Sequence, residues 1–181
     1  MKKGKVHSLS ISNQHTFSKK VIDQVEVIEG IGIKGDAHAG ITVKHRSRVA
    51  KDPTQPNLRQ IHLIHLELLN ELAEKGYTVN PGELGENITT VGISLLDLPK
   101  NTLLKIGKQV SIQITGLRNP CHQIDKFQKG LLKEVVGKDK SGAIVRMAGI
   151  MGIVLKGGII NSQDEIEITY PALPHYKLER V

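Results

Sequence analysis

Hydrophobic and polar residues alternate along several short stretches of the chain, which is the pattern of half-buried β-strands. The alternation predicts strands over residues 6–12, 21–28, 59–64, 86–90, 103–106 and 110–115, and near 143–147, 150–155 and 165–170. A Gly107-Lys108 pair between two of them is typical of a tight turn. We therefore expect a mainly β structure, a barrel or sandwich with helical insertions.

Helical spacing is confined to three places in the sequence. Leucines recur at three-residue intervals within residues 65–75, and Gly76 follows as a C-terminal stop. Shorter helical patches are predicted over 120–128 and 131–136. The helices are thus few and short beside the strands.

Two polar segments interrupt this pattern. Residues 30–36 carry three glycines in a short run, which permits positive φ angles or a close backbone approach to a ligand. Residues 44–57 are polar and basic, with Pro53 and Pro56, and predict a long exposed excursion. Loops of this length in compact domains are usually functional or mobile, so the excursion is a candidate flap.

Composition and charge narrow the class of protein. The 181 residues, 39% of them hydrophobic, predict a single domain over 1–181 with a real core. The formal charge of +7 favours anionic partners: phosphorylated small molecules, nucleic acid or a membrane surface. No signal peptide is recognisable, and the apolar stretch at 147–155 is less than half of the about 20 residues that a membrane helix needs. We expect no membrane partner.

The single cysteine, Cys121, is the sharpest chemical feature. A lone cysteine excludes an internal disulfide and fits a reducing, cytoplasmic compartment. Asn119 and Pro120 are typical of a helix start, which would place Cys121 in the first helical turn, where a thiolate is favoured. Arg118 and His122 add donors or positive charge beside the thiol. The alternative is a small buried hydrophobe, and a Cys–His nucleophile pair is a weaker interpretation still.

Two other kinds of site deserve weighing. Five histidines are candidate ligands for a zinc ion: His38, His45, His62, His65 and His122. Zinc requires three or four closely spaced ligands, so solvated or hydrogen-bonded histidine rings are the simpler interpretation. The basic run at 44–48 could contact RNA phosphates. Only 3% of the residues are aromatic, however, which leaves few side chains on which bases could stack. The alternative is that this basic run is a solvated surface.

Five separated segments, in this order and spacing, closely resemble the MOSC domain (molybdenum cofactor sulfurase C-terminal domain). They are GIKGDAHAG at 32–40, RQIHLI at 59–64, PGELGENI at 81–88, ITGLRNPC at 114–121 and AGIMGIV at 148–154. Each segment alone is weak, whereas all five in order are specific. The likeness extends over about residues 6–168.

This resemblance implies a distorted β-barrel with short helices and a pocket for the molybdenum cofactor, a phosphorylated pterin dithiolene. The family cysteine, here Cys121, either ligates molybdenum or carries a persulfide sulfur. The resemblance further implies cofactor-binding roles for residues around the pocket: Lys34, Asp36 and His38 on the glycine-rich loop, Arg59 on the neighbouring strand, and Glu86, Asn87, Arg118 and Asn119 near the pterin or phosphate. An anionic pterin agrees with the basic charge of the chain.

The chain differs from the larger relatives. It has no room for the pyridoxal-phosphate-dependent cysteine desulfurase domain, and no lysine is assigned to a Schiff base, so we do not predict pyridoxal phosphate. It also lacks the additional N-terminal barrel of the amidoxime-reducing relatives and resembles the compact stand-alone bacterial members.

Those members imply two activities for the same cysteine. One is a molybdenum-dependent redox enzyme that reduces N-hydroxylated compounds with electrons from a transfer protein. The other is a sulfur carrier, loaded by a cysteine desulfurase, for metal–sulfur cluster assembly or cofactor sulfuration. An RNA- or phosphate-binding barrel is a third and weaker hypothesis.

Overall fold

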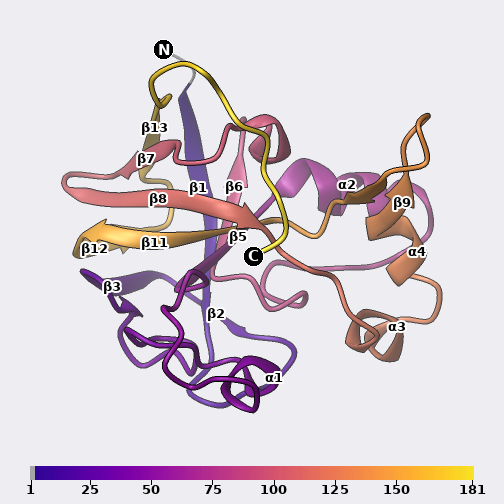
Figure 1. Ribbon diagram of the computed structural model, residues 1–181, viewed down its shortest axis with the longest axis horizontal. Helices are drawn as coiled ribbons and strands as arrows, with labels where there is room; N and C mark the ends of the chain where they lie inside the picture. Colours follow the sequence, from indigo (N-terminus) through magenta and orange to yellow (C-terminus); the bar gives the residue numbers. More distant parts are fainter. Residues whose placement is uncertain (1–2) are drawn as a thin grey trace.

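The computed structural model describes residues 3–181, in which seven strands close into a barrel (Figure 1). Around the barrel the order is β13 (Glu165–Thr169), β7 (Leu103–Ile106), β8 (Val110–Leu117), β11 (Ile150–Lys156), β5 (Ile61–His65), β6 (Ile88–Val91) and β1 (Lys3–Ile11). Pairing of β1 with β13 closes the ring. The β5–β6 pair is parallel and the other pairs around the ring are antiparallel. The expectation of a mainly β structure, a barrel with short helices, is confirmed.

The long strand β1 pairs with two different strands along one of its edges. Lys3, Gly4 and Lys5 pair with β13, whereas residues 9–11 pair with β2 (Lys20–Ile22). The register with β6 shifts between Val6 and Ser8, a bulge that bends the strand between its two partners. The predicted strand over 21–28 is in fact divided into β2 and β3 (Gln24–Ile28).

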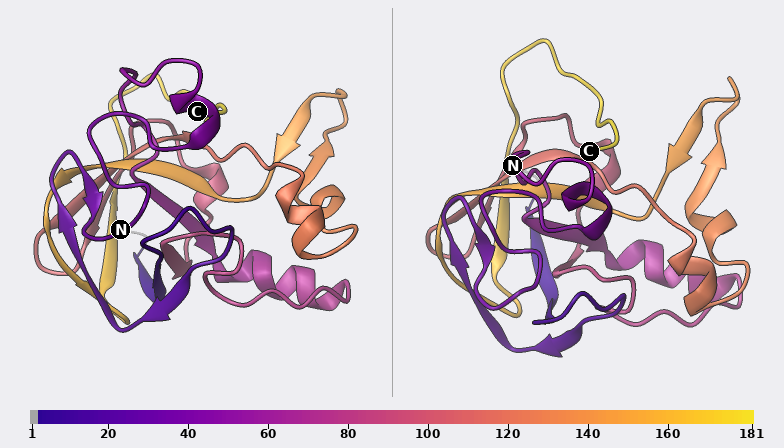
Figure 2. Two further views of the ribbon diagram at one scale, coloured as in Figure 1. Left: turned by 90° about the horizontal axis from the view of Figure 1, so that it is seen from below. Right: turned by 60° about the horizontal axis from the view of Figure 1, so that its bottom comes forward.

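Two small sheets lie outside the barrel. β3 pairs with β4 (Gly32–Ile33) and with β12 (Gly158–Asn161), whereas β9 (Val136–Lys138) and β10 (Ile144–Arg146) form a separate hairpin. The sequence pattern missed β9 and β12, since each is short and contains glycine and polar residues, and it missed the two-residue β4, which lies in the glycine-rich run at 30–36. Figure 2 shows the β9–β10 hairpin standing away from the barrel.

Alternation along the strands directs one set of side chains into the barrel. This larger core includes Val6, Leu9, Leu63, Ile88, Leu104, Ile112, Ile150 and Ile166. A second core lies where α2 (Leu66–Glu74), α3 (Gln123–Phe127) and α4 (Leu132–Val135) meet one side of the barrel (Figure 1); it includes Ile64, Leu69, Leu72, Ile124, Leu131 and Val135. β5 is buried on both faces because it separates these two cores.

The remaining helical elements are single turns. α1 (Arg46–Val49) lies inside the basic excursion that the sequence marks at 44–57, and the 3₁₀ turn η1 (Leu95–Asp97) follows β6. Gly76 has a φ of 87° just after α2, so the predicted helix stop is confirmed. Within residues 3–181, no helix has the length and apolar character to cross a membrane.

Candidate functional site

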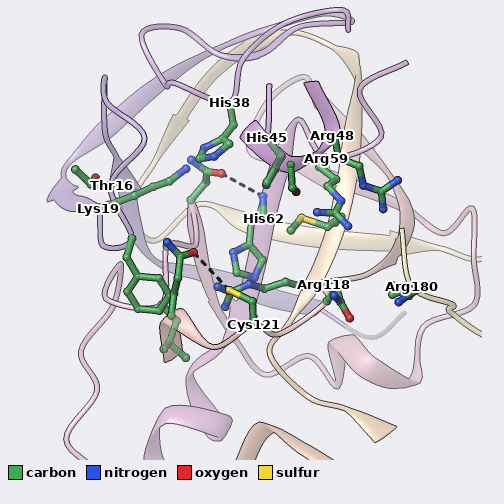
Figure 3. A pocket seen from close by; sticks show the side chains of 18 of the residues that line it. Thr16, Lys19, His38, His45, Arg48, Arg59, His62, Arg118, Cys121 and Arg180 are labelled. Carbon is green, nitrogen blue, oxygen red and sulfur yellow. Dashed lines mark hydrogen bonds between the residues drawn. The ribbon is translucent and has the colours of Figure 1, made fainter. Parts of the chain in front are cut away.

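A cavity of about 470 Å³ lies beside the C-terminal end of β8, between the basic excursion and the loop that carries Cys121 (Figure 3). Its charged lining is entirely basic: Lys19, Arg48, Lys51, Arg59, Arg118 and Arg180. No carboxylate of residues 3–181 lines it. Neutral polar groups come from Thr16, Ser47, Asn87, Asn119 and Gln123, and the one thiol from Cys121. Such a lining attracts an anion.

The Cys121 thiol lies on the loop between β8 and α3. It is partly exposed, and its Sγ lies 3.4 Å from Gln123 Oε1, to which it donates. Figure 3 places it beside the Arg118 guanidinium at one end of the pocket. The thiol is therefore accessible to a ligand in the pocket.

The predicted helix start at Asn119 and Pro120 is wrong. The Arg118 backbone N–H donates to the Gly149 carbonyl at 3.0 Å, which keeps the chain extended beyond the predicted strand end, so α3 begins only at Gln123. Cys121 thus precedes the helix. Asn119 Oδ1 accepts a hydrogen bond from Arg146 Nε at 3.2 Å instead of capping a helix. The positive group beside the thiol is Arg118, not a helix terminus.

Arg118 has an unused donor. Its Nη1 is buried and has no hydrogen-bond partner within residues 3–181, and its guanidinium lies 5.9 Å from the centre of the Phe17 ring. Burial lowers the pKa of Arg118, while the neighbouring Cys121 and Glu86 raise it. A buried donor without a partner is costly, so a ligand acceptor at this position would relieve the cost.

A buried polar network supports the opposite side of the pocket. Asp36 accepts hydrogen bonds at Oδ2 from Lys19 Nζ at 2.7 Å and from Asn87 Nδ2 at 3.0 Å. Its Oδ1 accepts the His38 backbone N–H at 2.9 Å and lies 3.3 Å from His38 Nδ1. Burial raises the pKa of Asp36, but the His38 and Lys19 contacts outweigh it and hold the pKa well below the usual range. The carboxylate therefore fixes the direction of the His38 ring.

The histidines of the pocket are packed, not grouped as metal ligands. The His38 ring centre lies 4.5 Å from that of His45 and 5.1 Å from that of His15. Burial, with the positive charge of neighbours, lowers the pKa of His45 to about 3. His62 Nε2 lies 2.9 Å from the Ala148 carbonyl, and burial keeps its pKa far below the usual value. No three His, Cys, Asp or Glu side chains in residues 3–181 are placed to hold a metal ion, which leaves the zinc hypothesis without a ligand set.

The structure brings six of the nine predicted site residues to the pocket wall: His38, Arg59, Asn87, Arg118, Asn119 and Cys121. Asp36 lies behind that wall, in contact with Lys19. Glu86 is also behind it, fully buried, with Oε1 accepting from the Gly82 N–H at 2.6 Å and from Thr89 Oγ1 at 3.1 Å. These two residues support the lining instead of forming it.

Lys34 does not reach the pocket. Its backbone N–H donates to the Glu26 carbonyl at 2.9 Å, and its Nζ pairs with Glu26 Oε2 at 2.6 Å on the exposed side of β3. Sequence reasoning assigned no role to the lining residues Lys19, Lys51 and Arg180. It named Arg48 only as part of the basic run at 44–48, and His45 and His62 only as zinc candidates. The basic excursion contained a signal for Arg48 and Lys51, whereas nothing in the sequence marks Arg180.

The chain is similar to known proteins in sequence and in structure. The MOSC domain family model matches residues 48–167. The structure is similar to YuaD from Bacillus subtilis, with a TM-score of 0.78 and 24% identity over 94% of this chain and 97% of that one. It is also similar to YiiM from Geobacillus stearothermophilus, with a TM-score of 0.68 and 16% identity over 96% of this chain and 79% of that one.

A second YiiM, from Escherichia coli, has a TM-score of 0.63 and 15% identity over 95% of this chain and 73% of that one. No curated protein sequence matches this chain. The likeness to these solved structures concerns the fold. The family model, in contrast, covers most of the barrel and the Cys121 segment, and the chain therefore belongs to the MOSC domain family.

Proposed function

We propose that this protein binds the molybdenum cofactor in the pocket and that Cys121 is the protein ligand to the metal. The MOSC family is associated with this cofactor, an anionic phosphorylated pterin dithiolene. One observation carries the proposal: the only thiol of the chain lies in a pocket whose charged lining is all basic, next to the unpartnered Arg118 Nη1. Thiolate is a ligand for soft metal centres, and a guanidinium suits an anionic acceptor.

The chain's own residues divide the work of holding such a ligand. Cys121 would supply the sulfur ligand and Arg118 Nη1 a hydrogen bond to an anionic oxygen or sulfur. The side chain of Asn87 is already engaged, because its Oδ1 accepts the His62 backbone N–H at 3.1 Å and its Nδ2 donates to Asp36. It acts as a positioning residue that ties β5 to the Asp36 network.

The reaction we propose is reduction of an N-hydroxylated compound. R–NH–OH takes up two electrons and two protons, its N–O bond breaks, and R–NH₂ and water leave. When bound, the molybdenum cofactor supplies this two-electron chemistry, with an electron-transfer protein as the reductant. In its doubly protonated form, His38 would provide one of the protons from Nε2, because Asp36 Oδ1 holds Nδ1 of the same ring and leaves Nε2 for the pocket. Solvent would supply the second proton.

A reductase assay tests this function. Wild type, expressed with abundant molybdate, should reduce an N-hydroxylated base with an artificial electron donor. Cys121→Ser should lose the activity and keep its fold, because the thiol is partly exposed. The matched control is Lys126→Gln on the exposed side of α3, which should retain full activity. A Cys121→Ser variant as fast as wild type would refute the role of the thiol.

A sulfur carrier is the second candidate, favoured by a different feature of Cys121. No other cysteine exists in the chain, so a persulfide formed here cannot be resolved into an internal disulfide. The Cys121 thiolate would attack the outer sulfur of a desulfurase persulfide; a new S–S bond forms, and the desulfurase thiolate leaves.

Mass spectrometry after incubation with a cysteine desulfurase and cysteine tests this alternative. A sulfur carrier gains one sulfur atom on Cys121, and Cys121→Ser gains none. Absence of the adduct in wild type would exclude the carrier. RNA binding has less support, because His45, Arg48 and Lys51 of the basic excursion line the concave pocket, which suits a small anion better than a strand.

A further inference from the structure

The C-terminal segment, residues 170–181, presents large apolar side chains to solvent. Tyr170, Leu173 and Tyr176 are 47%, 81% and 64% exposed. The remaining aromatic residues pack against the second core: Phe17, Tyr77 and Phe127. Figure 2 shows the segment, in yellow, looping out beyond the barrel in its right-hand view. Two of the three tyrosines thus face solvent on one segment, and tyrosine is a residue that anchors protein interfaces.

Hydrogen bonds hold this segment against the barrel. The Lys100 N–H donates to the Tyr176 carbonyl at 2.8 Å, and the Leu117 N–H of β8 donates to the Glu179 carbonyl at 2.7 Å. Between these two points Leu178 is buried in the larger core. The exposed side chains therefore stand on a fixed backbone, and a partner that binds them would have little of the segment left to order.

An apolar groove of about 490 Å³ lies beside Tyr176. One wall is the C-terminal segment, and the other is the 3₁₀ turn η1 with the residues that follow it. Its apolar lining consists of Leu96, Leu98, Pro99, Tyr176 and Leu178. A large apolar side chain that enters the groove removes apolar surface from water on both sides, which is favourable.

A second cavity, of about 290 Å³, adjoins the groove and shares Leu96 and Asp97 with it. Its carboxylates come from two elements: Glu67 and Glu71 lie one turn apart on α2, and Asp97 ends η1. No lysine or arginine of residues 3–181 lines the cavity, and none of the three carboxylates forms an ion pair there. The cavity therefore attracts a cation, although the chain as a whole has a formal charge of +7.

Two buried polar atoms of this acidic cavity lack a partner. Glu67 Oε1 accepts the Gly92 N–H at 2.7 Å, but Glu67 Oε2 and His65 Nδ1 have no hydrogen-bond partner within the described residues 3–181. Burial lowers the pKa of His65, while the three carboxylates act in the opposite direction, which places them near the ring. Buried polar atoms without a partner are costly, so a group that bonds to them from within the cavity relieves that cost.

The cation that suits the cavity is an organic one. No three His, Cys, Asp or Glu side chains in the described part of the chain are placed to hold a metal ion. An ammonium or guanidinium group needs no such ligand set, because each of its N–H groups can donate to a separate carboxylate. Lysine and arginine side chains carry these groups.

We propose that the apolar groove and the acidic cavity together bind a segment of a partner protein that carries a lysine or arginine beside a large apolar residue. The apolar side chain fills the groove against Tyr176, and the cation enters the cavity near Glu71 and Asp97. The carboxylates repel nucleic acid and anionic lipid, so a protein is the partner that matches both halves of the surface. The groove and the cavity share no lining residue with the Cys121 pocket, and this inference does not depend on the proposed function.

Peptide selection tests the chemistry of the partner. Random peptides displayed on phage are selected on the immobilised full chain, after removal of phage that bind the double variant Glu71→Gln/Tyr176→Ser. We expect the selected peptides to share a lysine or arginine next to a large apolar residue. Absence of any selected peptide, or selected peptides without a basic residue, would overturn the proposal.

One selected peptide, labelled with fluorescein, is then titrated by fluorescence polarisation with wild type, Glu71→Gln, Tyr176→Ser and Glu74→Gln. Glu71 and Glu74 are both exposed on α2, but only Glu71 lines the cavity, so Glu74→Gln is the matched control. Glu74→Gln should bind as wild type does, and the other two variants about tenfold more weakly. Equal binding by all four proteins would overturn the surface. Circular dichroism verifies that each variant is folded, as expected for exposed positions.

Two other occupants of the surface are outcomes of further measurements. In sedimentation velocity, the association state of wild type should be unchanged in Glu71→Gln and Tyr176→Ser. A dimer that dissociates in both variants would overturn the separate partner and assign the surface to a second copy of this chain. Binding of wild type to phosphatidylcholine vesicles that is lost in Tyr176→Ser would overturn a protein partner in favour of a lipid surface.

Discussion

The ion pair between Lys19, on the pocket wall, and Asp36, behind it, is buried, and replacing Asp36 by Asn should destabilise the protein strongly. Lys19 Nζ lies 2.7 Å from Asp36 Oδ2, and the two side chains are 2% and 0% exposed. An amide leaves the Lys19 ammonium without a counter-charge and turns one acceptor into a donor. Removing one partner of a buried ion pair costs about 3–5 kcal/mol. In a chain of this size the loss lowers Tm by roughly 6–20 °C.

Urea unfolding at pH 7, followed by circular dichroism, measures the loss. The double variant Lys19→Met/Asp36→Asn should be less destabilised than the sum of the single variants, because it removes both charges. Glu26→Gln is the control: it breaks the exposed Lys34–Glu26 pair, at 2.6 Å, where the cost should stay below about 1 kcal/mol. An Asp36→Asn variant as stable as this control would refute the importance of the buried network.

Three further predictions concern stability. His45 is neutral in the fold, with a pKa lowered to about 3 by burial. The unfolded chain, with an imidazole pKa of about 6.5, takes up its proton first as the pH falls, so stability decreases below that pH, by about 2 kcal/mol at pH 5. His45→Gln should flatten the pH profile of urea unfolding, and an unchanged profile would contradict this. Gly149→Ala should lose at least about 2 kcal/mol in the same assay, since the residue has a φ of 93° and a Cβ would meet the Leu63 carbonyl; a neutral effect would contradict the tight approach. Glu86→Gln should lose less stability at pH 7 than Asp36→Asn, because burial raises the pKa of Glu86 and its Oε2 has no partner within residues 3–181, whereas Asp36 is paired with Lys19. A large loss there would show that the charge is needed.

The barrel could be predicted where local pattern and packing agree. In β7 and β13, alternate residues face the core, as their sequences indicate. The leucines of α2 face the second core, and Gly76 ends that helix in the conformation that glycine adopts most easily. The closing contact between β1 and β13 joins opposite ends of the chain, and no local signal specifies it.

The site could be predicted only in part, because loop direction depends on distant contacts. Asn119 and Pro120 have the chemistry of a helix start, but the bond from Arg118 to Gly149 extends the chain through them. Lys34 lies next to pocket residues in sequence, yet pairing of β3 with β4 brings it to Glu26. Arg180 reaches the pocket solely because the C-terminal segment pairs with β8.

The central claim is that the pocket holds the molybdenum cofactor through Cys121, and the metal and pterin content of the purified protein tests it most directly. Wild type and Cys121→Ser, expressed with abundant molybdate in a host that loads a control molybdoenzyme, are analysed for molybdenum, tungsten and zinc, and for pterin fluorescence after oxidation. We predict near-stoichiometric molybdenum and pterin in wild type, with molybdenum lost from Cys121→Ser. Wild type with neither molybdenum nor pterin, or a variant that retains molybdenum in full, would contradict the account.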